Sequence, residues 1–308
     1  MRIKSVAKRG GVVVAYGVLR VLSRTPLAFN RALGRSVGRV CALLLRRQRR
    51  LAMANLDLAF GGSLNEPEKR RIVRGVFENA GIVVAEFPKL RLLAQPRRAG
   101  LVEVIGAEML EPGRGAILVS SHMGNWEWMA AAVASLNLSV AEVVNTYRDD
   151  VQERWINEFR CRGGISTVPK EGAITTLVKL LAEGTHVGLL CDQSPKRNAL
   201  PVAFFGHQCW TSPGPALLAL RTGAPVHYIA FWRNPDGNYT LEISPQIVFE
   251  RTGDIRDDAL ALTQIFQNYI ERAVRAHPDQ WLWTYPRWKD RPRARRRWEQ
   301  RSAMRSAA

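Results

Sequence analysis

Over residues 102–276, short runs of β-branched and aliphatic residues alternate with longer stretches in which apolar residues repeat every three or four positions. Runs of the first kind predict buried strands, and stretches of the second kind predict amphipathic helices. The predicted strands are 102–105, 116–120, 139–144, 187–191, 226–231 and 239–243. The predicted helices are 126–136, 151–162, 173–183, 213–221 and 257–276. This alternation predicts an α/β fold with a mixed, mostly parallel sheet flanked by helices.

The chain before the first predicted strand has a helical pattern. Asn65 is a suitable N-cap, and Pro67 a suitable first-turn residue, for a helix over 66–93. Upstream of this helix, apolar residues recur at helical spacing with arginines between them: Val12, Val13, Tyr16, Leu19, Leu22, Leu33, Val37, Val40 and Leu44. This pattern predicts one or two basic helices that lie in a membrane interface. A short membrane span over 8–22 and a helix packed on the body of the protein are the alternatives.

Basic residues concentrate at the two ends of the chain. The 308 residues include 45 Lys and Arg against 27 Asp and Glu, a formal net charge of +18. Residues 1–56 hold 13 basic residues and no acidic one, and residues 287–308 hold nine basic and two acidic ones. We therefore expect a membrane-associated helical segment over 1–50, a near-neutral domain over 51–290 and a basic tail over 291–308.

The charge and the cysteines narrow the classes of protein. Basic ends suit an anionic membrane face, an acidic protein or nucleic acid, but no helix-turn-helix, RNP-like or zinc signature supports nucleic acid as a partner. The four cysteines are scattered, without a CxxC pair or a Cys/His spacing suited to zinc, which predicts reduced, buried cysteines of a cytoplasmic protein and no metal site. A serine hydrolase would carry G-x-S-x-G, and the sequence lacks it.

The candidate chemistry lies where the predicted strand 116–120 ends. His122 and Glu127 are five residues apart, and on one continuous helix they would point about 140° apart. They meet only if His122 lies in the turn before the helix, with Gly124 supplying the bend and Glu127 in the first helical turn. A histidine whose ring is held by a carboxylate has a fixed tautomer, which makes it a good general base. The sequence therefore predicts His122 as the base and Glu127 as the residue that orients it.

The string His-Met-Gly-Asn-Trp-Glu over 122–127 resembles the His-x-x-x-x-acid motif of the glycerolipid acyltransferase superfamily. Its Gly-Asn-Trp-Glu form resembles the bacterial lipid A late (secondary) acyltransferases, the lauroyl/myristoyl acyltransferase family. Further segments resemble that family's blocks in the same order: 55–60, 145–148, 160–163, 192–193, 204–206, 217–226 and 281–289. The sequence departs from the family at Met123, where Phe is common, and over 194–200, which is more basic than the expected glycine-rich loop.

The resemblance implies acyl transfer from a thioester on acyl carrier protein to a hydroxyl group of a lipid A precursor, with no cofactor. It implies an enzyme at the inner membrane, with its active site on the cytoplasmic side. In this reading the basic ends meet membrane lipids and the acidic carrier protein. Beyond the catalytic pair, the candidate substrate-binding residues are Asn125, Arg148, Arg160, Lys170, Asp192 and Gln193.

Several roles stay open at the level of the sequence. Arg148 is either a phosphate or carboxylate clamp or a solvated partner of the next two aspartates, and Arg160 and Lys170 carry the same ambiguity. Asp192 either holds the acceptor sugar, supports the clamp or caps the next turn. Phosphatidylinositol mannosides or ornithine lipids are alternative acceptors. A non-enzymatic basic protein that binds membranes or nucleic acid is the alternative from another class.

Overall fold

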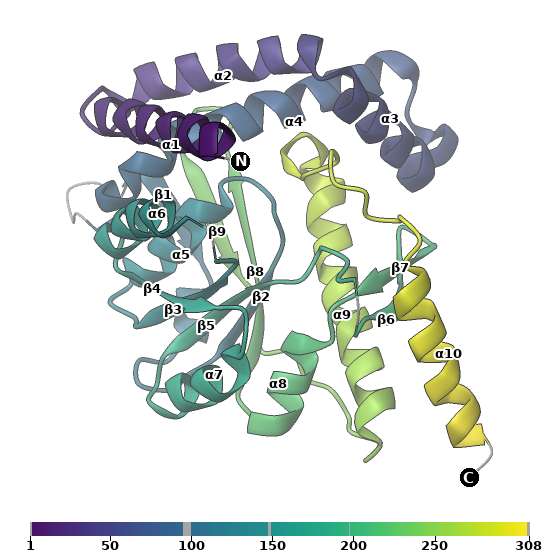
Figure 1. The fold of residues 1–308 in the computed structure, drawn as a ribbon. Helices are drawn as coiled ribbons and strands as arrows, with labels where there is room; N and C mark the ends of the chain where they lie inside the picture. Colours follow the sequence, from purple (N-terminus) through teal and green to yellow (C-terminus); the bar gives the residue numbers. More distant parts are fainter. Residues whose placement is uncertain (1, 95–99, 147–148, 197, 307–308) are drawn as a thin grey trace.

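The computed structural model describes residues 2–94, 100–146, 149–196 and 198–306. Within them, seven strands form one sheet in the order β1-β9-β8-β2-β5-β3-β4, and β6 and β7 form a separate hairpin (Figure 1). Neighbouring strands of the large sheet are parallel except β8 and β9. The strands are β1 (Val102–Ile105), β2 (Ile117–Ser120), β3 (Val140–Val144), β4 (Ile165–Pro169), β5 (His186–Leu190), β6 (Leu200–Phe204), β7 (His207–Thr211), β8 (Val226–Arg233) and β9 (Tyr239–Ile243). The predicted mixed, mostly parallel α/β sheet is confirmed.

Helices cover both faces of the sheet because alternate strand residues point to opposite sides. Ile117 and Val119 of β2 pack into one core with α7, α8 and α9, whereas Leu118 packs into a second core with α5 and α6. The helices are α1 (Arg2–Leu22), α2 (Leu27–Leu44), α3 (Arg46–Phe60), α4 (Glu66–Glu86), α5 (Trp126–Ala134), α6 (Asp150–Arg162), α7 (Ala173–Ala182), α8 (Gly214–Thr222), α9 (Ile255–Ala276) and α10 (Pro292–Ser306). Short 3-10 helices lie at Gly61–Ser63, Phe87–Leu92, Ala107–Met109 and Pro278–Gln280.

Three elements differ from the sequence-based expectation. Strand β4 and the β6–β7 hairpin were not predicted, because two adjacent polar residues interrupt or precede the apolar positions of β4 and β7, and Pro201 interrupts those of β6. The helix predicted over 66–93 begins as expected, with a capping box between Asn65 and Glu68, but ends at Glu86. It continues as a 3-10 helix because Pro88 has no backbone N–H to donate to an α-helical hydrogen bond.

The N-terminal helices lie across one end of the sheet (Figure 1). α2 packs on α4 so closely that a Cβ at Gly38 would collide with the backbone carbonyl of Phe77, and one at Gly81 with that of Gly34. In the described ranges, no helix combines the length and the apolar character that a membrane crossing needs. Residue 50, the expected end of the N-terminal segment, falls inside α3.

The basic tail predicted over 291–308 contains a helix, α10. Ala294 of α10 is buried beside Ala199 and Trp210, and Trp298 packs against the same small cluster. The Arg256 guanidinium of α9 stacks 3.7 Å from the centre of the Trp298 ring. The start of the tail is therefore docked on the body of the protein.

Candidate active site

Strands β2 and β5 are parallel neighbours, and the loops that follow them bring two titratable side chains together. Ser120 of β2 lies opposite Leu190 of β5, so that His122 and Asp192, two residues farther along each chain, meet at the same edge of the sheet. The Asp192 Oδ1 atom lies 2.7 Å from His122 Nδ1. Asp192 Oδ2 accepts hydrogen bonds from the His122 backbone N–H, at 2.9 Å, and from Trp281 Nε1, also at 2.9 Å.

The turn that carries His122 has the geometry the sequence predicted. Gly124 has φ +58°, and a Cβ there would collide with the carbonyl oxygen of Phe231, so only glycine fits. Asn125 is the N-cap of α5, its side chain accepting a hydrogen bond from the Trp128 backbone N–H at 3.1 Å. His122 lies before the helix, with its side chain 20% exposed. The strand, turn and helix therefore present the imidazole to a pocket from a rigid support.

The two partners shift each other's pKa. Burial disfavours the charged imidazole, but the charge and hydrogen bond of Asp192, helped by the charge of Glu127, raise the pKa of His122 above its ordinary value. Burial alone would raise the pKa of Asp192. The His122 charge and the hydrogen bonds from His122 and Trp281 outweigh burial and hold that pKa below its ordinary value. The pair is thus an ionised carboxylate beside a histidine that accepts a proton readily.

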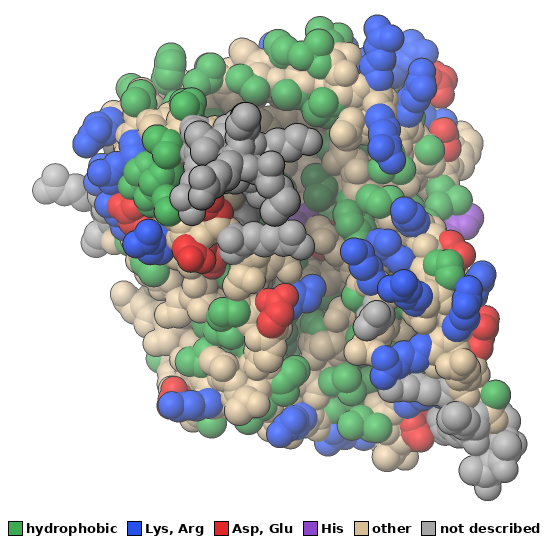
Figure 2. Space-filling model, in the orientation of Figure 1, with side chains coloured by type: hydrophobic (Ala, Val, Ile, Leu, Met, Phe, Trp, Pro, Cys, Tyr) green, Lys and Arg blue, Asp and Glu red, His purple; other side chains and the backbone are tan. Residues whose placement is uncertain are grey.

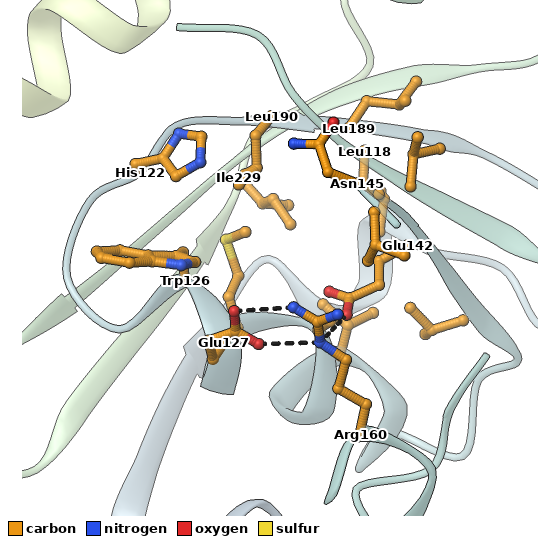
Figure 3. Close-up of a pocket in the computed structure, with 17 residues that line it drawn as sticks. Leu118, His122, Trp126, Glu127, Glu142, Asn145, Arg160, Leu189, Leu190 and Ile229 are labelled. Atoms are coloured by element: carbon orange, nitrogen blue, oxygen red, sulfur yellow. Dashed lines mark hydrogen bonds and ion pairs between the residues drawn. The ribbon is translucent and has the colours of Figure 1, made fainter. Parts of the chain in front are cut away.

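Glu127 does not hold the His122 ring, and the expected contact between them is corrected. The Glu127 carboxylate accepts a two-pronged hydrogen bond from Arg160, at 3.1 Å from Nε and 3.0 Å from a terminal nitrogen. Arg160 Nε also lies 2.9 Å from Glu142 Oε1 (Figure 3). In the first turn of α5, Glu127 points toward this buried guanidinium of α6, whereas Asp192 approaches His122 from the loop after β5.

A pocket of about 240 Å³ lies between His122 and this ion-pair group. Figure 3 shows His122, Trp126 and Ile229 around one part of it, with Glu127 and Arg160 at the other. Most of its other lining side chains are aliphatic: Leu118, Met129, Ala130, Val133, Val140, Val143, Val144, Leu189 and Leu190. Burial, reinforced by the negative charge of Glu127 and opposed by Arg160, raises the pKa of Glu142. The pocket thus has apolar walls that suit a hydrocarbon chain and an ionic group at one side.

The structure gives the other predicted site residues different settings. Gln193 lies beside the imidazole, its amide nitrogen 3.3 Å from His122 Nε2. Asn125 is fully buried, and its side chain also donates a 2.7 Å hydrogen bond to Glu86. Asn125 therefore holds the turn and does not face the pocket. Lys170 is exposed after the edge strand β4 and does not line the pocket.

The two predicted arginines have different outcomes. Arg160 is nearly buried, and the carboxylates of Glu127 and Glu142 already occupy its guanidinium. Arg148 lies outside the described residues.

Sequence reasoning missed two carboxylates of the site. Glu142 lies on the predicted strand 139–144, where one charged residue in an apolar run signals either an exposed position or a buried partner. Glu86 is fully buried at the end of α4 and binds Arg31 of α2 at 2.5 Å, the Tyr239 hydroxyl at 2.5 Å and Asn125. Only the packing of four separate elements shows that Glu86 supports the turn that carries His122.

Comparisons with known proteins agree with the resemblance inferred from the motifs. The chain is 25% identical over 292 residues to the lipid A biosynthesis lauroyltransferase of Escherichia coli (strain K12), covering 90% of each protein. It is 24% identical over 283 residues to the lipid A biosynthesis palmitoleoyltransferase of the same strain, again with 90% of each covered. It is 26% identical over 183 residues to the phosphatidylinositol mannoside acyltransferase of Mycolicibacterium smegmatis, with 58% of each covered.

The family model described as bacterial lipid A biosynthesis acyltransferase matches residues 4–290 of the chain. The match includes the turn that carries His122, both strands that support it and the ion-pair group beside the pocket. Since it spans nearly the whole sequence, the chain belongs to the bacterial lipid A biosynthesis acyltransferase family and is an acyltransferase.

Proposed function

We propose that this enzyme transfers a fatty acyl group from an acyl carrier protein thioester to a hydroxyl group of a lipid A precursor, at the cytoplasmic side of the inner membrane. The observation that carries the proposal is the 2.7 Å contact between Asp192 and His122, which lines a largely aliphatic pocket. Family membership and two relatives named as lipid A acyltransferases support the acceptor class.

In the proposed reaction His122 is the general base and Asp192 the positioning residue. Asp192 accepts a hydrogen bond from Nδ1–H, which places the lone pair on Nε2, where it can take the proton of the acceptor hydroxyl. The hydroxyl oxygen then attacks the thioester carbonyl carbon, a C–O bond forms, and the C–S bond breaks as the tetrahedral intermediate collapses. The imidazolium returns its proton to the departing thiolate. Because the acceptor oxygen attacks the thioester directly, no acyl-enzyme is formed. The Asp192 charge stabilises the imidazolium between these steps.

The remaining residues are assigned by their positions. Glu127 acts through its charge and through the Arg160 pair, which fixes one wall of the pocket. Gln193 contacts the imidazole edge and is placed to hydrogen-bond the acceptor or the thioester. Arg148 and Lys170 stay predicted ligands for phosphate groups of the acceptor.

Two basic surfaces are suited to contact the acyl carrier protein and the membrane that holds the acceptor. The exposed arginines of α10 are suited to the acidic carrier protein, because opposite charges steer association. The amphipathic N-terminal helices are suited to an anionic leaflet, where each cation near the surface contributes about 1 kcal/mol.

The test is mass spectrometry of lipid A from cells with and without the gene. We expect deletion to remove one secondary acyl chain, and the mass difference to give its length. Complementation with a His122→Ala variant should leave the acyl chain absent. Complementation with an equally expressed Lys179→Ala variant, changed at an exposed residue of α7 away from the pocket, should restore it and so separates loss of the base from general loss of protein. An unchanged lipid A profile in a strain without a redundant enzyme contradicts the proposed acceptor.

A second acceptor has one specific observation in its favour, the match to a mycobacterial phosphatidylinositol mannoside acyltransferase. That match covers 58% of the chain, against 90% for the lipid A enzymes. Incubating the purified enzyme with acyl carrier protein thioester and each acceptor in turn discriminates the two. Transfer to the phosphatidylinositol mannoside alone would replace the lipid A proposal.

A further inference from the structure

The N-terminal helices expose two apolar stripes, which no element in the described part of the chain covers. On α2, large hydrophobic side chains recur every three or four positions and are all exposed: Phe29, Leu33, Val37, Val40 and Leu44. On α1, Val14, Val18 and Val21 are exposed at the same spacing. Between α1, α2 and α4 the stripes border an apolar groove of about 470 Å³. At 1.5 Å per residue, the α2 stripe is about 22 Å long.

A basic groove adjoins this apolar face on the other flank of α2. It has a volume of about 1100 Å³ and lies between α2, α3 and α4. Its lining contains five arginines and two acidic residues: Arg39, Arg49, Arg50, Arg70, Arg74, Asp57 and Glu66. Ala42, Leu43, Met53, Ala54 and Val73 line the rest. Figure 2 shows Lys and Arg side chains gathered near α3, beside hydrophobic side chains along α2.

Not all of the cations in this groove are neutralised by the protein. Arg39 pairs with Glu78, at 2.7 Å, and Arg70 with Glu66, at 3.6 Å. Arg50 and Arg74 form no ion pair with any residue in the described ranges. Two uncompensated guanidiniums facing one groove form a site for a multivalent anion, because each guanidinium can bind phosphate through two hydrogen bonds.

We propose that the groove between α2, α3 and α4 seats the phosphate group of a membrane lipid, while the stripes of α1 and α2 lie among the acyl chains. An anionic lipid carries a phosphate and apolar chains in one molecule, which is the combination that the adjoining basic and apolar faces present. An acidic soluble protein would neutralise Arg50 and Arg74 but leave the 22 Å stripe in water. The inference rests on the proposed membrane location and not on the proposed reaction.

The seat is connected to the catalytic centre through the opposite side of α3. Asn55 is nearly buried and donates hydrogen bonds to the backbone carbonyls of Trp283, at 2.7 Å, and Tyr285, at 2.9 Å. The same segment carries Trp281, which binds Asp192. A lipid held on the outer side of α3 therefore fixes the orientation of the membrane relative to the pocket.

The experiment measures partition of the full-length enzyme onto phosphatidylcholine vesicles with and without phosphatidylglycerol. The test pair is Arg50→Gln with Arg74→Gln, and the matched control is Lys179→Gln with Arg221→Gln. The control removes the same charge from exposed residues of α7 and α8, at the opposite end of the molecule (Figure 1). We expect the test pair to lose about 30-fold in partition onto anionic vesicles, which corresponds to about 1 kcal/mol per cation, and the control to lose less than threefold.

Four results would overturn the proposal. The first is an equal loss in the two pairs, which would indicate a response to net charge alone. The second is an unchanged partition of the test pair. The third is loss of acyl carrier protein binding in the test pair with vesicle binding retained, which would assign the groove to an acidic protein. The fourth is binding of inorganic phosphate as tight as binding of the vesicles.

The proposed reaction is tested separately with the wild type in detergent. A wild type that transfers acyl groups in detergent but does not bind anionic vesicles overturns the lipid seat and leaves the reaction standing. A wild type that binds anionic vesicles but transfers no acyl group overturns the proposed reaction and leaves the lipid seat standing.

Discussion

Replacing Asp192 by Asn tests whether this carboxylate, rather than Glu127, prepares His122 for catalysis. Oδ2 of Asp192 accepts two N–H groups, from the His122 backbone and from Trp281, so the amide oxygen of Asn takes that place. The amide NH₂ then faces His122 Nδ1. Because Nδ1 must accept this hydrogen bond, the ring proton moves to Nε2, where it blocks proton transfer from the acceptor hydroxyl.

The expected loss follows from the role of a positioned general base. Such a base contributes about 100- to 10 000-fold to the rate, so kcat should fall by about that factor, or about 3–5 kcal/mol. KM should change little because Asp192 is buried and does not line the pocket. In the wild type, kcat/KM falls as the pH falls through the raised pKa of His122. Without the Asp192 charge, burial lowers that pKa, so the acid limb should move to lower pH.

The assay is the pH dependence of kcat and kcat/KM for transfer from acyl carrier protein thioester, with Glu127→Gln as the matched variant. Glu127 acts on His122 through charge alone, so its removal should move the acid limb less than Asp192→Asn does. Thermal melting checks that both variants fold. The reasoning is refuted if Asp192→Asn retains wild-type kcat, or if Glu127→Gln causes the larger shift of the acid limb.

Three further substitutions test the support of the site. Gly38→Ala should lower the melting temperature by several degrees, since overpacking costs about 1–3 kcal/mol, whereas Gly17→Ala, with open space around it, should not. Arg160→Met leaves the partly buried carboxylates of Glu127 and Glu142 without their cation, which further raises the pKa of Glu142. Stability should then fall as pH rises from 5 to 8, because the folded state binds the extra proton, and a flat melting temperature over this range would contradict the argument. Glu86→Gln should lower both melting temperature and kcat, measured by calorimetry and initial rates, and unchanged kcat would remove its positioning role.

Local patterns were sufficient to predict most of the fold and the turn that carries His122. Strand and helix periodicity repeats every two or every 3.6 residues, so six strands of the main sheet and the helices between them could be predicted from short windows. The same holds for His122 before a helix that Asn125 caps, because a cap and a glycine with positive φ are properties of a few consecutive residues. The same local rules failed at two places: the predicted α-helix ends at Glu86 and not at residue 93, and β4 was not predicted.

The partners of the chemical groups were decided by the tertiary structure. His122 and Asp192 are 70 residues apart and meet because β2 and β5 pair in parallel, a choice that no short window contains. Glu127, the nearer carboxylate in sequence, is drawn instead to Arg160 of α6. The sequence by itself thus determined which residues could carry the reaction and on which elements they lie. Which carboxylate holds the base depends on strand order and helix packing, since a hydrogen bond is set by distance in space and not along the chain.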